Sequence, residues 1–196
     1  MPPPKKNLLI PALVVAALAT STGMAIAQTE VITFDDLGAG GFIPNGYAGL
    51  QWQNFRYLDG VHYPYPSGYQ NAVVSPNYVT DNWGGFPAMF SGPTFNLNSA
   101  YLTAAFIDGL QVEVQGFVGT TLTYDNTYTV NTTGPTLINF NYLGVDKVNF
   151  STYYNSLPNY NFAMDNLSIT IVPEPTTFAM VGLGSTALFM MFRRRK

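Results

Sequence analysis

Apolar and polar residues alternate with a period of two in several short segments of the second half of the chain. In residues 111–117 (QVEVQGF) the valines fall on one face and the glutamines and glutamate on the other. The same alternation recurs in residues 137–143 (LINFNYL), 147–152 (KVNFST) and 166–172 (NLSITIV). This pattern is typical of half-buried strands in an antiparallel sheet. No segment between residues 28 and 172 carries a convincing stripe of helical period, so we predict an all-β domain there.

Turn-forming residues separate these segments, and the spacing of the strands indicates an antiparallel β-sandwich of jelly-roll type. The predicted turns are Asp108-Gly109, Gly119, Asp125-Asn126, Thr133-Gly134-Pro135 and Leu157-Pro158-Asn159. In the first half the pattern is weaker. There we expect short strands at residues 31–34, within 47–57 and at 72–74, and a loop rich in Pro and Tyr over residues 60–69.

Residues 1–27 have the organisation of a secretory signal peptide. Two lysines precede an apolar segment, residues 8–19, and the small-x-small cleavage pattern of Ala25 and Ala27 follows. The alternative is an uncleaved anchor helix, but the apolar segment is too short to span a bilayer well. We therefore expect cleavage, with the mature chain starting at Gln28.

The C-terminal end combines three features in a fixed order. Pro173, Glu174 and Pro175 are followed by an uncharged apolar segment, residues 176–192, and then by the cations of residues 193–196. As a helix, residues 176–192 are about 25 Å long, which is just enough for a transmembrane helix whose terminal cations snorkel. The cations should remain cytoplasmic by the positive-inside rule.

This tail resembles the PEP-CTERM sorting signal, which occurs on exported proteins of Gram-negative bacteria that make exopolysaccharide. The resemblance implies that Pro173, Glu174 and Pro175 are recognised by exosortase, a membrane-embedded transpeptidase-like enzyme. It also implies an intermediate held in the inner membrane during sorting, followed by the cell surface or the extracellular matrix. The alternative is a plain tail anchor.

The net charge of residues 28–172, the body of the chain, indicates which kinds of molecule it can bind. Between residues 28 and 172 there are two cations and ten acids, a net formal charge of −8. A nucleic-acid partner is excluded because no basic face exists to neutralise phosphates. The chain has no cysteine, which excludes disulfides, thiolate metal sites and cysteine nucleophiles.

Three segments of the body resemble the β-sandwich domains that often accompany this sorting signal. They are ITFDDL at residues 32–37, YLTAAFIDGLQVEVQGF at 101–117 and FAMDNLSI at 162–169. Those domains are similar to galactose-binding or carbohydrate-binding jelly rolls. The resemblance implies a fold more than a ligand.

Two acidic segments form a candidate calcium site. Asp35 and Asp36 close the first predicted strand, and Asp165 and Asn166 open the last. The first and last strands of a jelly roll commonly lie close together, and calcium binds six to eight oxygens of carboxylates, amides and carbonyls. Jelly rolls of the carbohydrate-binding type often carry a structural calcium ion there. The alternative is that these side chains only cap turns.

The aromatic residues of the first half form a candidate glycan-binding surface, because sugar rings stack on aromatic planes while amides and carboxylates bind their hydroxyls. The candidate aromatic residues are Trp52, Tyr63, Tyr65 and Trp83. The candidate polar partners are Asp59, Asp81 and Asn82. The alternative is that these rings pack in the core or in loops.

An enzyme is not expected. His62 is the only histidine, no G-x-S-x-G motif occurs, and the side chains of the adjacent Asp35 and Asp36 diverge on a strand. Two functions remain open. The first is a binding module for extracellular polysaccharide, and the second is a structural envelope or biofilm-matrix protein with no discrete ligand.

Overall fold

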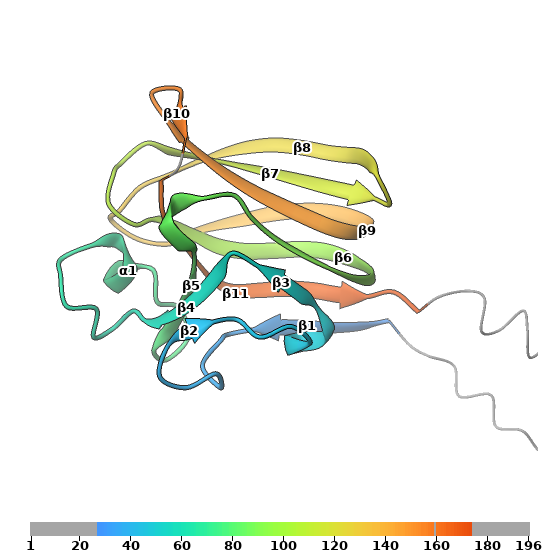
Figure 1. The fold of residues 1–196 in the computed structure, drawn as a ribbon, viewed down its shortest axis with the longest axis horizontal. Helices are drawn as coiled ribbons and strands as arrows, with labels where there is room; N and C mark the ends of the chain where they lie inside the picture. The colour runs from blue at the N-terminus through green and yellow to red at the C-terminus, as the bar shows by residue number, and fades with distance from the viewer. Residues whose placement is uncertain (1–26, 159, 174–196) are drawn as a thin grey trace, which may run out of the picture.

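The computed structural model describes residues 27–158 and 160–173, which form a β-sheet body (Figure 1). The strands are β1 (Gln28–Ile32), β2 (Gly41–Phe42), β3 (Gln51–Gln53), β4 (Phe55–Asp59), β5 (Tyr78–Asn82), β6 (Ala88–Ala104), β7 (Leu110–Val118), β8 (Thr121–Val130), β9 (Thr136–Tyr154), β10 (Leu157–Pro158) and β11 (Phe162–Ile171). The helical turns are η1 (Tyr47–Gly49), α1 (Gly68–Asn71) and η2 (Trp83–Gly85). In these two ranges no helix is both long enough and apolar enough to cross a membrane.

The strands of the described residues form one large antiparallel sheet in the order β2-β4-β5-β11-β6-β9-β7-β8. Strand β1 adds to β11, β3 to β6 and β10 to β9. Gln28 lies opposite Ile171, so the two ends of the described body leave the molecule side by side (Figure 1). Helix α1 lies at the opposite end of the molecule (Figure 1).

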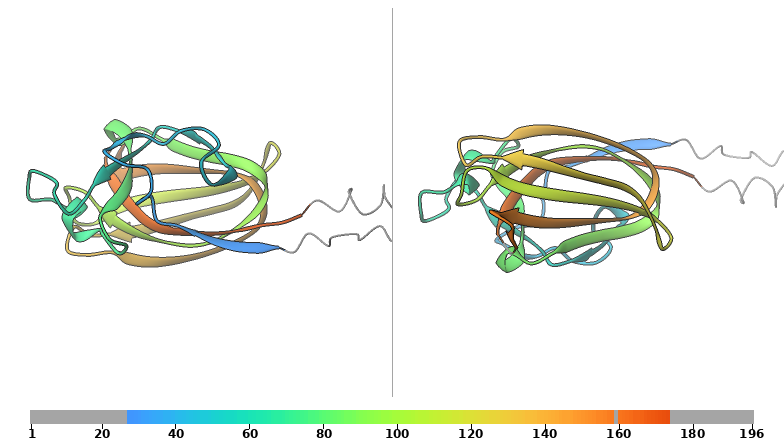
Figure 2. Two further views of the ribbon diagram at one scale, coloured as in Figure 1. Left: turned by 90° about the horizontal axis from the view of Figure 1, so that it is seen from below. Right: turned by 90° about the horizontal axis from the view of Figure 1, so that it is seen from above.

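The two longest strands, β6 and β9, bend the sheet so that its two halves face each other across the core (Figure 2). The register between them shifts between Ser91 and Phe95, where Pro93 interrupts the ladder. Proline cannot donate to a strand ladder, so it is confined to such irregular positions. In β9, Gly144 has a φ of 66°, which glycine adopts without strain. The same strands therefore contribute to both halves of the sheet.

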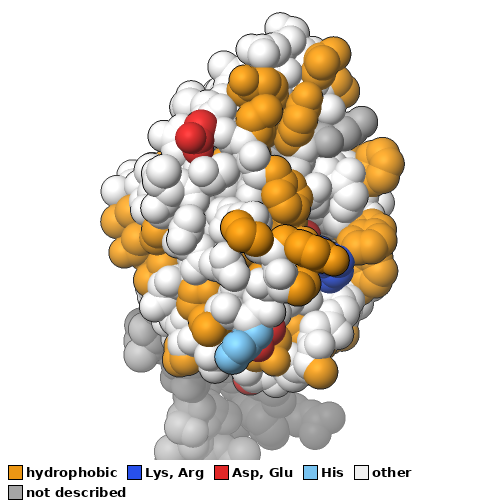
Figure 3. Space-filling model, turned by 90° about the vertical axis from the view of Figure 1, so that its left-hand side faces the viewer, with side chains coloured by type: hydrophobic (Ala, Val, Ile, Leu, Met, Phe, Trp, Pro, Cys, Tyr) orange, Lys and Arg blue, Asp and Glu red, His pale blue; other side chains and the backbone are white. Residues whose placement is uncertain are grey.

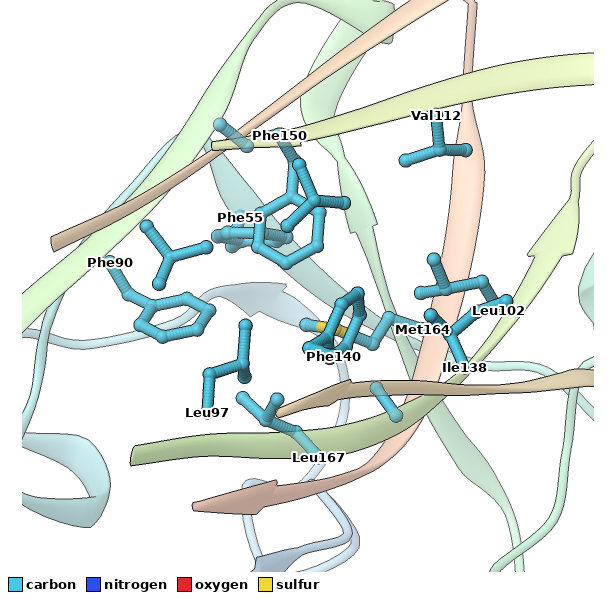
Figure 4. Close-up of a cluster of buried hydrophobic side chains, with 14 of the residues drawn as sticks. Phe55, Phe90, Leu97, Leu102, Val112, Ile138, Phe140, Phe150, Met164 and Leu167 are labelled. Atoms are coloured by element: carbon cyan, nitrogen blue, oxygen red, sulfur yellow. The ribbon is translucent and has the colours of Figure 1, made fainter. Parts of the chain in front are cut away.

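Aromatic and aliphatic side chains pack together in the core between the two halves (Figure 4). Phe150 stacks on Phe162 with ring centroids 5.6 Å apart, and Phe55 meets Phe150 edge-on at 5.7 Å. These three side chains and Phe90 are buried. Such rings bury large apolar areas, and their burial stabilises a domain that has no disulfides.

The all-β class and the antiparallel arrangement predicted from the sequence are confirmed. In β7 the side chains of Val112 and Val114 are buried, as their alternation predicts. Residues 137–143 and 147–152 are strands too, but they belong to the single strand β9, because the bulge near Gly144 bends the strand without ending it.

Three local predictions are wrong. Leu157 and Pro158 form strand β10 opposite Tyr154 and Tyr153 of β9, because the chain turns earlier, at Asn155 and Ser156, which have positive φ values. Asp125 and Asn126 lie inside β8 and do not form a turn, because Gln115 and the Tyr142 hydroxyl satisfy their side chains. Residues 72–74 follow α1 and are not a strand, because the Val74 amide donates to the carboxylate of Asp165. The predicted signal peptide, apart from Ala27, and the predicted transmembrane helix over residues 176–192 lie outside the described residues.

Candidate functional site

An ion pair between neighbouring strands organises one surface of the body. Arg56 of β4 lies directly opposite Asp81 of β5. The guanidinium donates from Nε to Oδ1 at 3.2 Å and from Nη2 to Oδ2 at 2.8 Å. The Tyr69 hydroxyl donates to the same Oδ2 at 2.7 Å, and Asp81 is 0% exposed. Burial disfavours the charged guanidinium, but the hydrogen bonds and charge of Asp81 outweigh it and raise the pKa of Arg56. Arg56 is therefore fixed in orientation as a permanent cation.

Two exposed aromatic rings extend this surface on one side of Arg56. The guanidinium carbon lies 4.6 Å from the centre of the Trp83 ring, a cation–π contact. Phe42 meets Trp83 edge-on at 5.7 Å. Trp83 is 43% exposed and Phe42 is 59% exposed. The Trp83 ring is thus held in place by its neighbours and remains accessible to a ligand.

Three tyrosines extend the surface on the other side. Tyr69 is buried against Asp81, and Tyr63 packs on it with ring centroids 4.7 Å apart. Tyr65 lies 6.3 Å from Tyr63 and is 68% exposed. An unbroken series of contacts thus joins Tyr65 to Trp83. Figure 3 shows apolar side chains around a basic side chain at this end of the molecule.

A shallow pocket with a volume of about 320 Å³ opens beside the tyrosines. Its walls include Gln70, Asn71, Phe106 and Thr132. Gln70 donates to the Tyr63 carbonyl at 2.9 Å, which ties the pocket to the tyrosine loop. Ser67 also lines it, and its hydroxyl oxygen is buried without a hydrogen-bond partner among the described residues. The pocket therefore offers polar groups next to exposed rings.

The structure divides the predicted glycan-binding residues. Tyr63, Tyr65 and Trp83 belong to the surface just described. Trp52 does not, which corrects the prediction: it is 6% exposed and packs on Phe90 with ring centroids 5.1 Å apart. A buried ring cannot stack on a sugar.

The predicted polar partners are corrected as well. Asp81 and Asn82 are buried, and Asn82 accepts from the Phe162 amide while donating to the carbonyls of Phe86 and Tyr160. Asp59 accepts from the His62 backbone at 2.9 Å and contacts the His62 ring at 2.8 Å. Asp81 therefore supports the surface from beneath through Arg56, Asn82 connects β5 to β11, and Asp59 supports its own loop.

Sequence reasoning missed Arg56 and Phe42 as members of the surface. A signal for Arg56 existed, because it is one of only two cations between residues 28 and 172 and sits between two aromatic residues. Phe42 carried no comparable signal, since it lies on a strand of two residues.

The predicted calcium ligands gather only in part. Asp35 accepts from the Asn77 and Tyr78 amides at 3.0 Å each. Asp165 accepts from the Val74 amide at 2.7 Å and the Ser75 amide at 2.9 Å. Both carboxylates thus contact the segment of residues 74–78.

The pKa values of Asp35 and Asp165 are shifted in opposite directions by the balance of burial and hydrogen bonding. Burial alone would raise the pKa of Asp35, but the amides of Tyr78 and Asn77 outweigh it and lower the pKa. At Asp165, burial outweighs the hydrogen bonds of Ser75 and Val74 and raises the pKa. Asp165 therefore lacks a positive partner sufficient to offset its desolvation.

Two buried oxygens of the predicted calcium ligands are unsatisfied. Asp35 Oδ2 and Asn166 Oδ1 have no hydrogen-bond partner among the described residues. Unsatisfied buried oxygens fit a cation, which would coordinate them directly. Asp36 is separate, since it accepts from the Tyr47 hydroxyl at 2.6 Å. Within residues 27–158 and 160–173 no group of three or more Asp, Glu, His or Cys could hold a metal ion. A calcium site here would therefore depend on two carboxylates, an amide and carbonyl oxygens.

Comparison with known proteins identifies the C-terminal end. Residues 172–196 match the model of the PEP-CTERM protein-sorting motif. This motif implies export, processing by exosortase and sorting to the cell surface. No curated protein matches the chain.

The body is similar to a solved carbohydrate-binding module. The structure of TmCBM61 in complex with β-1,4-galactotriose matches with 6% identity and a TM-score of 0.34. The match covers 66% of this chain and 95% of the other. Similarity at this level assigns neither a ligand nor a site.

Proposed function

We propose that this chain is an exported, non-enzymatic glycan-binding module whose tail is processed by exosortase. Removal of residues 1–27 would free the N-terminus, and a helix over residues 176–192 would hold the chain in the inner membrane of a Gram-negative bacterium during sorting. The body, a β-sandwich of jelly-roll type, would then act at the cell surface or in the extracellular matrix. The match of residues 172–196 to the sorting motif supports this route.

The observation that carries the binding function is the exposed Trp83 ring fixed on Arg56. A ring that is already immobilised loses little conformational entropy when a sugar stacks on it. Arg56 uses two donors on Asp81, and a guanidinium has five. Its remaining donors can bind sugar hydroxyls beside the stacked ring. A purely structural aromatic cluster would bury the ring, whereas Trp83 is exposed.

The position of this surface suits a ligand outside the cell. The ends of the described body leave the molecule together, and α1 with its loop lies at the opposite end (Figure 1). A tail anchored in a membrane would therefore direct the tyrosine loop away from the bilayer. Extracellular polysaccharide is the glycan that a chain on this route would meet.

We further propose a structural calcium ion held by Asp35, Asp165 and Asn166. The unsatisfied oxygens of Asp35 and Asn166 support this assignment. A bound divalent cation would also supply the positive charge that the buried carboxylate of Asp165 lacks. The ion would fasten the turn after β1 to β11 and would take no part in binding sugar.

Affinity gel electrophoresis with the polysaccharides of the producing bacterium tests the binding function. We expect the full-length chain to be retarded, and the variant Trp83→Ala to lose most of the retardation. The matched control is Leu143→Ala, because Leu143 is another exposed apolar side chain, on β9. Equal retardation of both variants would overturn the assignment of Trp83. Absence of retardation for the unmodified chain with every polysaccharide would favour a matrix protein with no discrete ligand.

A further inference from the structure

Strand β8 is a long, bare edge of the sheet. It runs from Thr121 to Val130 at the end of the strand order and pairs with β7 alone among the described strands. All its side chains except Tyr124, Tyr128 and Val130 are exposed. Figure 1 shows β8 at the outer margin of the sheet, beyond β7. The backbone groups on its outer side are a template for another strand.

This edge lacks the features that usually protect a sheet edge. Natural edges are shortened, bulged, or given proline or lysine. β8 has ten residues with no proline, glycine or lysine, and Asp125 is its only charge. Its ladder with β7 has one irregularity, between Gly116 and Phe117 near one end. By contrast, β2 and β10 have two residues each and β3 has three.

The first half of β9 also has only one partner strand, but its backbone is irregular. Asn141 and Gly144 have φ values of 55° and 66°, and the register against β6 shifts repeatedly. Bulges of this kind twist an edge away from regular pairing. Of the two long edges in the described body, β8 is the one that presents a regular ladder.

Packing on the inner face holds β8 in its extended conformation. Tyr124 stacks on Tyr142 with ring centroids 4.4 Å apart and planes inclined by 7°. Tyr128 meets Phe140 edge-on at 5.5 Å. The Tyr142 hydroxyl donates to Asn126 Oδ1 at 2.9 Å. The edge is therefore ordered in advance, which reduces the entropy that a pairing partner must overcome.

We propose that two copies of this chain associate by antiparallel pairing of their β8 strands, centred on Asn126. A two-fold axis perpendicular to a sheet keeps the inner faces of both copies on the same side. Residues that meet across it must therefore share a face, so the two members of each pair are identical or an even number of positions apart. With Asn126 on the axis, the pairs are Asn126 with Asn126, Asp125 with Thr127, Tyr124 with Tyr128, Thr123 with Thr129 and Leu122 with Val130.

The sequence of β8 is complementary to itself in this register. It places tyrosine opposite tyrosine and threonine opposite threonine, both of which are favourable cross-strand pairs. An apolar pair, Leu122 with Val130, ends the ladder. Centring the axis one residue earlier would place the two copies of Asp125 directly opposite each other, and like charges so placed are destabilising. The charge thus selects Asn126 over its neighbour as the centre.

Disulfide trapping tests both the pairing and its register, because the chain contains no cysteine. The full-length variants Thr123→Cys, Thr129→Cys and Thr121→Cys are prepared separately and oxidised alone or in equimolar pairs. All three positions are exposed on β8. Directly opposite residues lie about 4.5–5.5 Å apart between Cα atoms, within the range of an unstrained disulfide.

We expect covalent dimers of twice the chain mass from the mixture of T123C with T129C. In the proposed register Thr123 of one copy lies opposite Thr129 of the other. The two copies of Thr123 are therefore six residues out of register, about 20 Å apart. T123C alone, T129C alone and T123C mixed with T121C should therefore remain monomeric. Dimers from T123C alone would contradict the register. Equal dimer yields from every combination, or none from any, would overturn pairing through β8.

Discussion

Arg56 and Asp81 face each other across β4 and β5 and form a two-point ion pair directly beneath the exposed Trp83 ring. The pair connects the interior to the surface, because Asp81 is buried and the Arg56 side chain is 27% exposed. Its geometry also determines where Trp83 lies, since the ring packs on the guanidinium. The stability of the body and the shape of the candidate glycan site therefore depend on the same contact.

Asp81→Asn should lower the free energy of unfolding by about 3 kcal/mol, because it removes the charge that balances a partly buried guanidinium. The measurement is chemical denaturation followed by tryptophan fluorescence. Asp59→Asn is the matched control, since Asp59 contacts only the exposed His62 among the described side chains and should change stability by under about 1 kcal/mol. If Asp81→Asn and Asp59→Asn lower the free energy of unfolding equally, the ion pair with Arg56 contributes no more to stability than the exposed contact with His62.

The two tryptophans should behave oppositely when each is replaced by alanine. Trp52→Ala removes a ring buried among Phe34, Phe55 and Phe90, and should cost about 3–5 kcal/mol of stability. Trp83→Ala removes an exposed ring and its cation–π contact, which is worth about 1 kcal/mol or less. Denaturation curves of both variants give the comparison. A larger loss for Trp83→Ala would mean that the ring has a structural role.

The difference between these two rings illustrates what the sequence could predict. Gln51 and Gln53 flank Trp52, and this alternation is the signal of an inward-facing residue on a strand. Trp83 precedes two glycines with positive φ and lies in a turn. Amino-acid composition alone placed Trp52 and Trp83 in one candidate surface. The alternation of residues around Trp52 distinguishes it, as a buried strand residue, from Trp83 in its turn.

Strands were predictable where buried and exposed residues alternate, as in β7. Strand β8 was missed because its threonines and tyrosines carry no clear alternation of hydrophobicity, although both residue types favour strands. The partnership of Arg56 with Asp81 was also beyond prediction, since it depends on the register of β4 against β5. Of the predicted calcium ligands, Asp35 and Asp165 both contact the segment of residues 74–78, a contact that the sequence pattern did not indicate, whereas Asp36 accepts from Tyr47.

Calcium should raise the melting temperature of the body. A site filled at 100 times its Kd contributes about 2.7 kcal/mol, which corresponds to roughly 5–11 °C for a domain of this size. The measurement is thermal unfolding in calcium and in EDTA. Asp165→Asn should abolish the difference, and Asp36→Asn should retain it because Asp36 contacts Tyr47 instead. An identical melting curve in calcium and EDTA for the unmodified chain would refute the site.

The acid stability of the metal-free body should depend on Asp35 and Asp165 in opposite directions. The pKa of Asp35 is lowered from 3.8, so its contribution to stability is present above that value and is lost as the pH falls through the folded-state pKa. Asn at this position removes that dependence, so Asp35→Asn should flatten the loss of stability below about pH 4.

The pKa of Asp165 is raised above 3.8 by burial, so the folded body binds its proton more tightly than the unfolded chain does. Its contribution is therefore fully present below 3.8 and is lost as the pH rises through the folded-state pKa. Asp165→Asn in EDTA should consequently remove a destabilising slope on the alkaline side of 3.8, the reverse of the effect of Asp35→Asn. Denaturation midpoints between about pH 3 and pH 7 would reveal both slopes. If the two substitutions change the slope of stability against pH in the same direction, the assigned environments are wrong, and the argument that a cation is needed beside Asp165 is lost.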